Sequence, residues 1–120
     1  MITIGHTWVE VEISDSEKKK STKIKALVDT GASLTVLPEK LAKQLGIKTI
    51  SEEKVSTGAG EVKIKRGRAW IKLEGKEDMF SVWISEIIDK VLIGVVTLES
   101  LGLEVDPVSE TLKERPLLLY

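Results

Sequence analysis

The stretch Ala26-Leu27-Val28-Asp29-Thr30-Gly31-Ala32-Ser33 sets a carboxylate between an apolar run and a turn of small residues. A second apolar run, from Leu34 to Leu37, follows the turn. The charged form of a carboxylate is costly to bury unless it is paired or hydrogen-bonded. Asp29 is therefore either satisfied by local hydrogen bonds or retained for chemistry.

The simpler alternative for this stretch is a turn, because Asp-x-Gly often occurs where an Asp side chain accepts a hydrogen bond from backbone two residues on. Three further features favour chemistry. The triplet follows an apolar β-type run, an apolar-apolar-Gly element (Leu92-Ile93-Gly94) lies downstream, and a hairpin tip rich in glycine (Thr57-Gly58-Ala59-Gly60) lies between them. This order and spacing are far more specific than the triplet alone.

Asp29-Thr30-Gly31-Ala32-Ser33, followed by Leu34-Thr35-Val36-Leu37-Pro38, resembles the active-site signature of the retropepsin-type aspartic proteases. The later elements, a glycine flap hairpin, Ile93-Gly94 and a short helix ending at Leu101-Gly102-Leu103, are similar to that family in order. The resemblance covers about residues 5–106. It implies one retropepsin-like domain over residues 1–120, with a core at about 5–106 and a C-terminal tail at 107–120.

The hydrophobic pattern predicts an all-β fold. Val9, Val11 and Ile13 alternate with polar residues, as expected of a half-buried strand, and β-type runs recur at residues 23–28, 48–57, 61–73, 79–85, 91–93 and 103–106. One short helix is predicted between Pro38 and Gly46, and a second before Gly102. This pattern predicts a small closed or nearly closed barrel with one or two short helices. The resemblance implies that the closed barrel is of retropepsin type.

Composition excludes several classes of function. The chain of 120 residues has a formal net charge of −1, which argues against a small β-barrel nucleic-acid binder. It has no Cys and only one His, His6, which argues against a zinc cluster or a His-based triad. No apolar run approaches the roughly 20 residues of a membrane span, and the first residues lack the pattern of a signal peptide. We expect a cytoplasmic protein with no metal, no cofactor, no nucleic acid and no membrane partner.

One aspartate is not enough for this chemistry, because aspartic proteases use two carboxylates that share a proton. The chain has five aspartates, and only Asp29 ends an apolar strand before Thr-Gly; the others are Asp15, Asp78, Asp89 and Asp106. A homodimer that brings Asp29 opposite its symmetry mate is the simplest closed solution. We therefore expect a homodimer that hydrolyses peptide or unfolded protein.

The resemblance also implies roles for the residues around Asp29. Thr30 would bond across the dimer interface, and Gly31 would allow close approach of backbone and substrate. Ala32 and Ser33 would line the floor of the site, with Ser33 as a candidate hydrogen-bond partner of Asp29.

Two further segments receive roles from the resemblance. Ile93 and Gly94 would pack behind the catalytic loop. The tip from Thr57 to Gly60, which comprises Thr57, Gly58, Ala59 and Gly60, would form a flap over an extended peptide.

Some features depart from the family pattern. Val95 and Val96 stand where many viral members carry a charged pair, and the flap tip is less apolar than theirs. The alternative is therefore a non-catalytic dimerisation or peptide-binding module with the same fold. The basic run Lys18-Lys19-Lys20 is either a docking patch or simply solvated.

Overall fold

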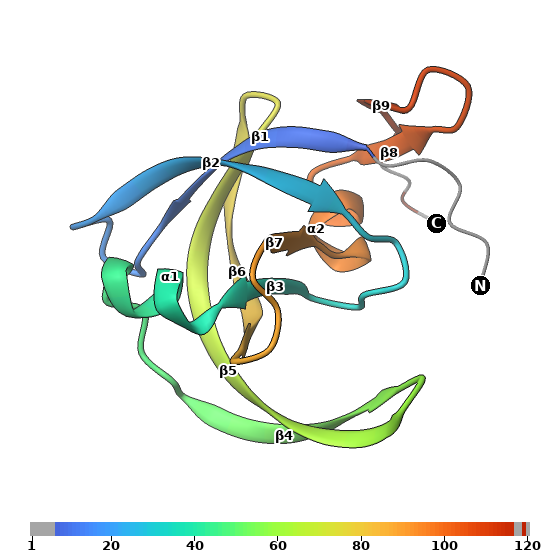
Figure 1. The fold of residues 1–120 in the computed structure, drawn as a ribbon. Helices are drawn as coiled ribbons and strands as arrows, with labels where there is room; N and C mark the ends of the chain where they lie inside the picture. The colour runs from blue at the N-terminus through green and yellow to red at the C-terminus, as the bar shows by residue number, and fades with distance from the viewer. Residues whose placement is uncertain (1–6, 117–118, 120) are drawn as a thin grey trace.

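A computed structural model of the chain describes residues 7–116 and 119 (Figure 1). The expected start of the core at residue 5, and His6, lie outside the described residues. Within them the elements run in the order β1 (Trp8–Ser14), β2 (Ser21–Val28), β3 (Thr35–Pro38), α1 (Glu39–Leu45), β4 (Ser51–Thr57), β5 (Gly60–Leu73), β6 (Lys76–Ser85), β7 (Val91–Ile93), α2 (Val95–Ser100), β8 (Leu103–Asp106) and β9 (Thr111–Glu114).

Six strands close into a barrel, and β5 is the strand that makes closure possible. The sheet runs in the order β1-β2-β7-β3-β6-β5-β4, and β1 also pairs with β5, so that the first six strands form a ring. The β2–β7 and β3–β6 pairs are parallel and the other pairs are antiparallel. The predicted all-β closed barrel with two short helices is confirmed, and its pairing is mixed.

The barrel interior is filled by aliphatic side chains from nearly every strand, as alternation along the strands predicted. Val11 and Ile13 from β1, Ala26 from β2 and Leu37 from β3 are all almost completely buried. Further members of this core are Ile71, Leu73, Phe80, Val82, Ile84, Val91, Ile93, Leu98, Leu101 and Leu103.

The helices begin and end close to the predicted punctuation. Gly46 follows α1 with a positive φ of 71°, a conformation that glycine adopts at no steric cost. Pro38, which marks the predicted start of this helix, is the last residue of β3 and directly precedes α1. Its φ of −59° and ψ of 139° are those of extended backbone. No helix within residues 7–116 and 119 is long and apolar enough to cross a membrane.

The C-terminal tail departs from the expected division at residue 106. Strand β9 pairs with β8 in an antiparallel hairpin, with Val105 opposite Leu112, and Leu112 packs against the core. The Arg115 N–H also donates a hydrogen bond to the carbonyl of Gly102. The predicted boundary therefore falls inside a hairpin, and residues 107–115 belong to the fold.

The barrel has two distinct ends in Figure 1. The β1–β2 hairpin and α1 lie at the left end, and the loop between β2 and β3 lies at the right end. The tip of the β4–β5 hairpin, which extends beyond the barrel, also lies on the right. The predicted flap and the predicted catalytic loop are therefore at the same end of the molecule.

Candidate active site

Strand pairing holds Asp29 at the end of β2. The last three residues of β2 pair in parallel with β7, where Val28 lies opposite Ile93. The Asp29 N–H continues this ladder by donating a 2.9 Å hydrogen bond to the carbonyl of Ile93. The Ala32 N–H then donates to the Asp29 carbonyl at 3.1 Å, which closes a tight turn. The backbone of Asp29 is thus held on both sides.

The Asp29 side chain is half-buried and has one hydrogen bond within the described residues. Its Oδ1 accepts the Gly31 N–H at 2.9 Å. A Cβ on Gly31 would lie 3.2 Å from the same oxygen, so a side chain there would crowd the carboxylate. The Oδ2 atom accepts no hydrogen bond from residues 7–116 or 119, which leaves it open for a further partner.

The structure thus shows the hydrogen bond of the turn alternative at Oδ1 of Asp29, and it leaves Oδ2 open to a further partner. The expected hydrogen bond from the Ser33 side chain is not formed: the only donor to the Asp29 carboxylate within the described residues is the Gly31 N–H. Thr30 and Ser33 are exposed, and Ala32 is half-buried.

Helix α2 attaches directly to this loop. The carbonyls of Ala32 and Ser33 accept hydrogen bonds from the N–H groups of Val95 and Val96, at 2.9 Å and 3.1 Å. The first N–H groups of a helix have no acceptor within the helix, and here carbonyls of the loop accept hydrogen bonds from two of them. The backbone of the loop is therefore fixed by the start of α2 as well as by β7.

Gly94 lies in contact with the chain just after the loop. A Cβ at this position would come within 2.4 Å of the Leu34 carbonyl carbon and 2.5 Å of its oxygen, so only glycine fits. The Gly94 N–H donates to the Thr35 hydroxyl at 3.1 Å, and that hydroxyl lies 2.8 Å from the hydroxyl of Thr97. Ile93 and Gly94 thus contact the loop that carries Asp29 from behind, as the resemblance implied.

Sequence reasoning missed the two threonines of this network. Thr35 and Thr97 are buried, with 0% and 1% of their surface exposed. The available signal was a hydroxyl inside an otherwise apolar run, Leu34-Thr35-Val36-Leu37, since a buried polar side chain needs a partner.

The predicted flap is a tight hairpin tip. Thr57 and Gly60 pair across it, and Gly58 and Ala59 form the turn between them. The Thr57 hydroxyl donates to the Gly60 carbonyl at 2.7 Å and accepts the Ala59 N–H at 3.1 Å. Gly60 has a φ of 109°, which disfavours any side chain there. All of these residues are exposed.

A second group missed from the sequence lies at the root of the hairpin. Glu53 on β4 accepts hydrogen bonds from the Arg66 guanidinium at 3.0 Å and from the Trp83 indole N–H at 2.7 Å. The three residues come from β4, β5 and β6, so the contact ties the hairpin to the barrel wall. No short sequence motif predicts this contact, because its three residues are far apart in the sequence.

Three of the four other aspartates accept hydrogen bonds from nearby backbone, and Asp89 has none within the described residues. Asp15 accepts the Lys20 N–H at 2.8 Å, Asp78 accepts the Met79 N–H at 2.7 Å, and Asp106 accepts the Val108 N–H at 2.9 Å. The bond from Val108, with weaker help from the Ser109 N–H, lowers the pKa of Asp106. Within the described residues no group of three or more His, Cys, Asp or Glu side chains is arranged to hold a metal ion.

Comparisons with known proteins agree with this geometry. A family model described as "Aspartyl protease" matches residues 9–105. A retropepsin-like aspartic protease from Rickettsia conorii has a similar structure, with 27% identity, a TM-score of 0.54, and 85% of each chain covered. EIAV protease, solved in complex with the inhibitor HBY-793, has 19% identity and a TM-score of 0.64, over 96% of this chain and 94% of its own.

A third similar structure is the retroviral protease-like domain of Ddi1 from Leishmania major. It has 17% identity and a TM-score of 0.57, over 95% of this chain and 88% of its own. No curated protein sequence gives a significant match. The mixed barrel with two short helices is thus the retropepsin-like fold predicted from the sequence.

Proposed function

Because the chain belongs to the aspartyl protease family, we propose that it is an aspartic endopeptidase that is active as a homodimer and cleaves extended peptide segments. The observation that carries the proposal is Asp29. It is held by backbone hydrogen bonds from two directions, and its carboxylate keeps one oxygen without a partner among the described residues. A rigid backbone with an open carboxylate suits a group that must meet a substrate.

The proposed chemistry needs two copies of Asp29, one from each subunit. Two carboxylates at short range resist ionising together, so the pair holds one proton over a range of pH and titrates as a unit. The ionised member takes a proton from a water between them as the water oxygen attacks the peptide carbonyl carbon. The protonated member donates to the carbonyl oxygen. As the tetrahedral intermediate collapses, the C–N bond breaks and the leaving nitrogen takes the proton that the first carboxylate removed from water. The hydroxyl formed from the carbonyl oxygen returns its proton to the second carboxylate, so that the pair again holds one proton.

The single chain offers one catalytic loop, and a two-fold dimer is the smallest closed arrangement that supplies a second. Thr30 and Gly31, next to Asp29, are exposed in the single chain and hence available to a second copy. The β4–β5 hairpin would cover the substrate, with Val55 and Val62 as a directly opposed apolar pair. An extended peptide under it would gain main-chain hydrogen bonds in the manner of an added strand.

The first test is digestion of an unfolded protein between about pH 3 and 7, the range in which coupled carboxylates titrate. Wild type is compared with Asp29→Asn, which keeps the size of the side chain and removes its charge. We expect cleavage by wild type and none by the variant. Equal cleavage by both would exclude Asp29 as the catalytic group. No cleavage by a wild-type protein that is dimeric would favour the non-catalytic peptide-binding module instead.

The dimer has its own test. Specific activity per chain is measured at falling protein concentration, with the association state followed by sedimentation. Since binding of a second subunit is governed by mass action, activity and the dimer fraction are expected to fall together. A monomer that retains full activity would contradict a site shared between subunits.

A further inference from the structure

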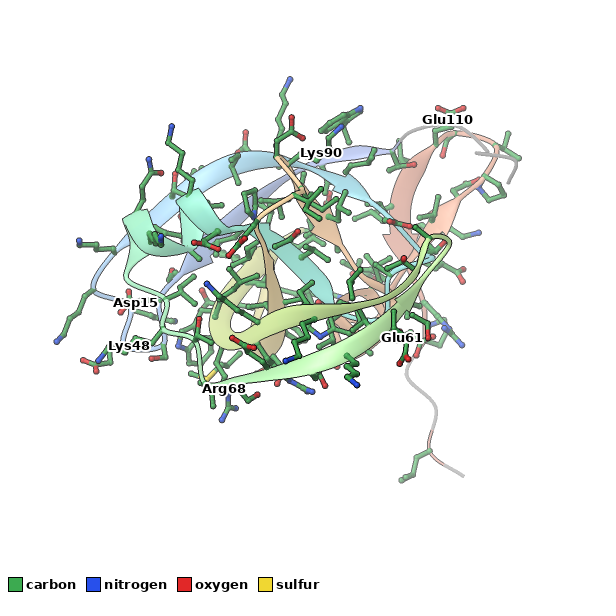
Figure 2. The ribbon with its side chains drawn as sticks, turned by 60° about the horizontal axis from the view of Figure 1, so that its bottom comes forward. Asp15, Lys48, Glu61, Arg68, Lys90 and Glu110 are labelled. Carbon is green, nitrogen blue, oxygen red and sulfur yellow. The ribbon has the colours of Figure 1, made fainter. Side chains whose placement is uncertain are left out.

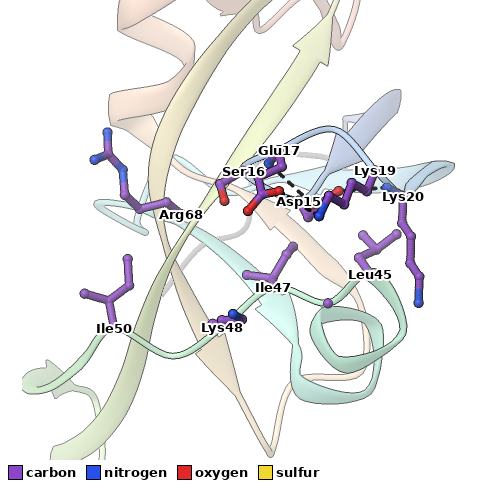
Figure 3. A pocket seen from close by; sticks show the side chains of 11 residues that line it. Asp15, Ser16, Glu17, Lys19, Lys20, Leu45, Ile47, Lys48, Ile50 and Arg68 are labelled. Carbon is purple, nitrogen blue, oxygen red and sulfur yellow. Dashed lines mark hydrogen bonds and ion pairs between the residues drawn. The ribbon is translucent and has the colours of Figure 1, made fainter.

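A pocket of about 360 Å³ (Figure 3) lies at the end of the barrel that carries the β1–β2 hairpin and α1, opposite the loop between β2 and β3 in Figure 1. The β1–β2 hairpin forms one wall, the end of α1 and the linker that follows it form another, and Arg68 on β5 completes the rim. Its volume lies near the lower limit of ligand sites, about 300–1,000 Å³. The pocket therefore suits one or two side chains of a peptide better than a large cofactor.

The pocket is distant from the catalytic loop. Lys20 lines it directly before β2, and Asp29 follows β2 at the other end. An extended strand rises about 3.3 Å per residue, so the eight residues of β2 separate the two by about 26 Å. Figure 2 shows Asp15, Lys48 and Arg68 at one end of the molecule and Glu61, near the tip of the β4–β5 hairpin, at the other. Occupancy of the pocket would leave the catalytic end free.

The floor of the pocket is aliphatic. It is formed by the buried side chains of Leu45 and Ile47, and Ile50, which is 64% exposed, lies at its edge. An exposed isoleucine beside an apolar floor leaves hydrophobic surface in water, which a second aliphatic side chain would cover.

The charged side chains around this floor are predominantly basic. Lys20, Lys48 and Arg68 line the pocket, and none of the three takes part in an ion pair within residues 7–116 and 119. The lining also contains an ion pair, in which Lys19 lies 2.9 Å from Glu17. The basic excess stands out in a chain whose formal net charge is −1.

Asp15 is the other acidic group of the lining, and backbone N–H groups of the β1–β2 hairpin donate hydrogen bonds to its carboxylate. Its two carboxylate oxygens accept backbone hydrogen bonds from Lys20 at 2.8 Å and from Glu17 at 3.4 Å (Figure 3). The run Lys18-Lys19-Lys20 therefore divides into three roles. Lys18 bonds Glu77 and lies over the Trp70 ring, Lys19 pairs with Glu17, and Lys20 faces the pocket.

We propose that this pocket is a docking site for an acidic segment of another protein that carries one aliphatic side chain. The aliphatic group would lie on Leu45, Ile47 and Ile50, and carboxylates on either side would meet Lys20, Lys48 and Arg68. Charge complementarity is the reason for choosing this occupant, because like charges would be excluded and opposite charges drawn in. In an active protease the pocket would hold a substrate or regulator far from the scissile bond.

The test measures binding and does not need activity. The probe is a short fluorescein-labelled peptide that alternates glutamate and glycine around one central leucine. Two matched peptides replace the glutamates by lysine or the leucine by glycine. Anisotropy is recorded with the dimer-competent full chain carrying Asp29→Asn, so that cleavage cannot remove the probe. We expect binding of the acidic leucine peptide only, and weakening between about 0.1 M and 1 M salt, where the Debye length falls from about 10 Å to 3 Å.

Variants assign the binding to the pocket. The double change Lys48→Glu with Arg68→Glu is expected to raise the Kd at least about tenfold, since it reverses the rim charge. Ile50→Ser is expected to weaken binding, and Ile50→Leu to preserve it. Lys40→Glu, an exposed charge reversal in the first turn of α1, is the control and is expected to bind as before. Circular dichroism melting confirms that each variant is folded.

Several results would overturn the proposal. Equal affinity of the charge-reversed and control variants would do so, as would equal binding of the lysine peptide. In NMR titrations, amide shifts confined to the Thr57–Gly60 tip would assign the peptide to the catalytic end instead. Association of two copies through this face, seen as loss of dimer in the charge-reversed variant, would also exclude an outside partner. Because the readout is binding, a chain that fails to cleave any substrate leaves this test intact.

Discussion

The hydroxyl oxygens of Thr35 and Thr97 lie 2.8 Å apart in the barrel interior, although 62 residues separate them in the sequence. Thr35 directly follows the loop that carries Asp29, and Thr97 lies in the first turn of α2. The Thr35 hydroxyl also accepts the Gly94 N–H. Three segments around Asp29 are therefore joined by one buried polar contact, and its loss would loosen the loop from behind.

We predict that Thr35→Val destabilises the fold by about 1–3 kcal/mol, because it removes the acceptor of a buried N–H and leaves that group unsatisfied. Thr97→Val is expected to cost less, since Gly94 keeps its partner. Urea unfolding measures both. If Asp29 is catalytic, kcat is expected to fall more than KM changes in each valine variant.

Thr97→Ser is the matched control for this pair, because it keeps the hydroxyl, and it is expected to remain near wild type. The double valine variant is expected to lose less stability than the sum of the single variants, since both changes act on one contact. Full stability of Thr35→Val would mean that the network does not hold the loop.

A second prediction concerns Gly94. A Cβ here would meet backbone atoms of Leu34 at 2.4 Å and 2.5 Å, and backbone cannot swing aside as a flexible side chain can. We predict that Gly94→Ala destabilises the chain by more than the roughly 1–3 kcal/mol of ordinary overpacking. Thermal unfolding and the yield of folded protein measure the effect.

The matched control is Gly58→Ala, because a Cβ at Gly58 meets nothing within 4 Å. Its melting temperature is expected to stay close to that of wild type. A Gly94→Ala protein as stable as this control would show that the loop and β7 can separate without cost.

Local patterns predicted much of the fold for a physical reason. Alternation such as Val9, Val11 and Ile13 reports which face of a strand is buried, and burial is what the barrel requires. The Asp29 turn could be predicted because burying a carboxylate within an apolar run costs free energy unless the carboxylate is hydrogen-bonded or paired. The turn at Gly46 was visible because few other residues adopt its backbone conformation.

Contacts between distant segments were not predictable in this way. The β8–β9 hairpin was missed because β9, Thr111–Glu114, has a single apolar residue, Leu112, and shows almost no alternation. Closure of the barrel between β1 and β5 depends on a pairing that no local pattern contains. At the candidate site, the same limit hid the Thr35–Thr97 contact, since each threonine alone is compatible with an ordinary strand or helix position.

A third prediction concerns the root of the β4–β5 hairpin. Glu53 bonds both Arg66 and Trp83, and its side chain is about one-third exposed. Partly exposed ion pairs contribute little, so Glu53→Gln is expected to change global stability by less than about 1 kcal/mol. Local opening is expected to increase, because β4 is an edge strand whose other contacts are mostly with β5.

Hydrogen exchange of the amides between Ser51 and Thr57 measures this opening, and the emission of Trp83 reports the lost contact. Glu52→Gln is the matched control, since Glu52 is the neighbouring exposed residue and has no side-chain bond within the described part of the chain. Equal exchange in the two variants would mean that Glu53 does not fasten the hairpin.

The last prediction concerns pH and Asp15, at the base of the β1–β2 hairpin. The hydrogen bond from the Lys20 backbone N–H, followed by that from Glu17, lowers the pKa of this carboxyl from its ordinary value of 3.8, and burial opposes the shift. At pH values just below 3.8 the unfolded chain therefore binds more protons than the folded chain. The contribution of Asp15 to stability is present above 3.8 and is lost as pH falls through the folded pKa.

Asp15→Asn removes this titration. We expect the melting temperature of wild type to exceed that of Asp15→Asn near neutral pH, and the gap to shrink as the pH falls below about 4. Asp89→Asn, at an exposed aspartate without a hydrogen bond in the described residues, is expected to show no such convergence. A gap between wild type and Asp15→Asn that stays constant down to about pH 2 would contradict the role of the Lys20 bond. Since Asp15 also forms a wall of the proposed docking pocket, acid that protonates it would weaken the hairpin and the pocket together.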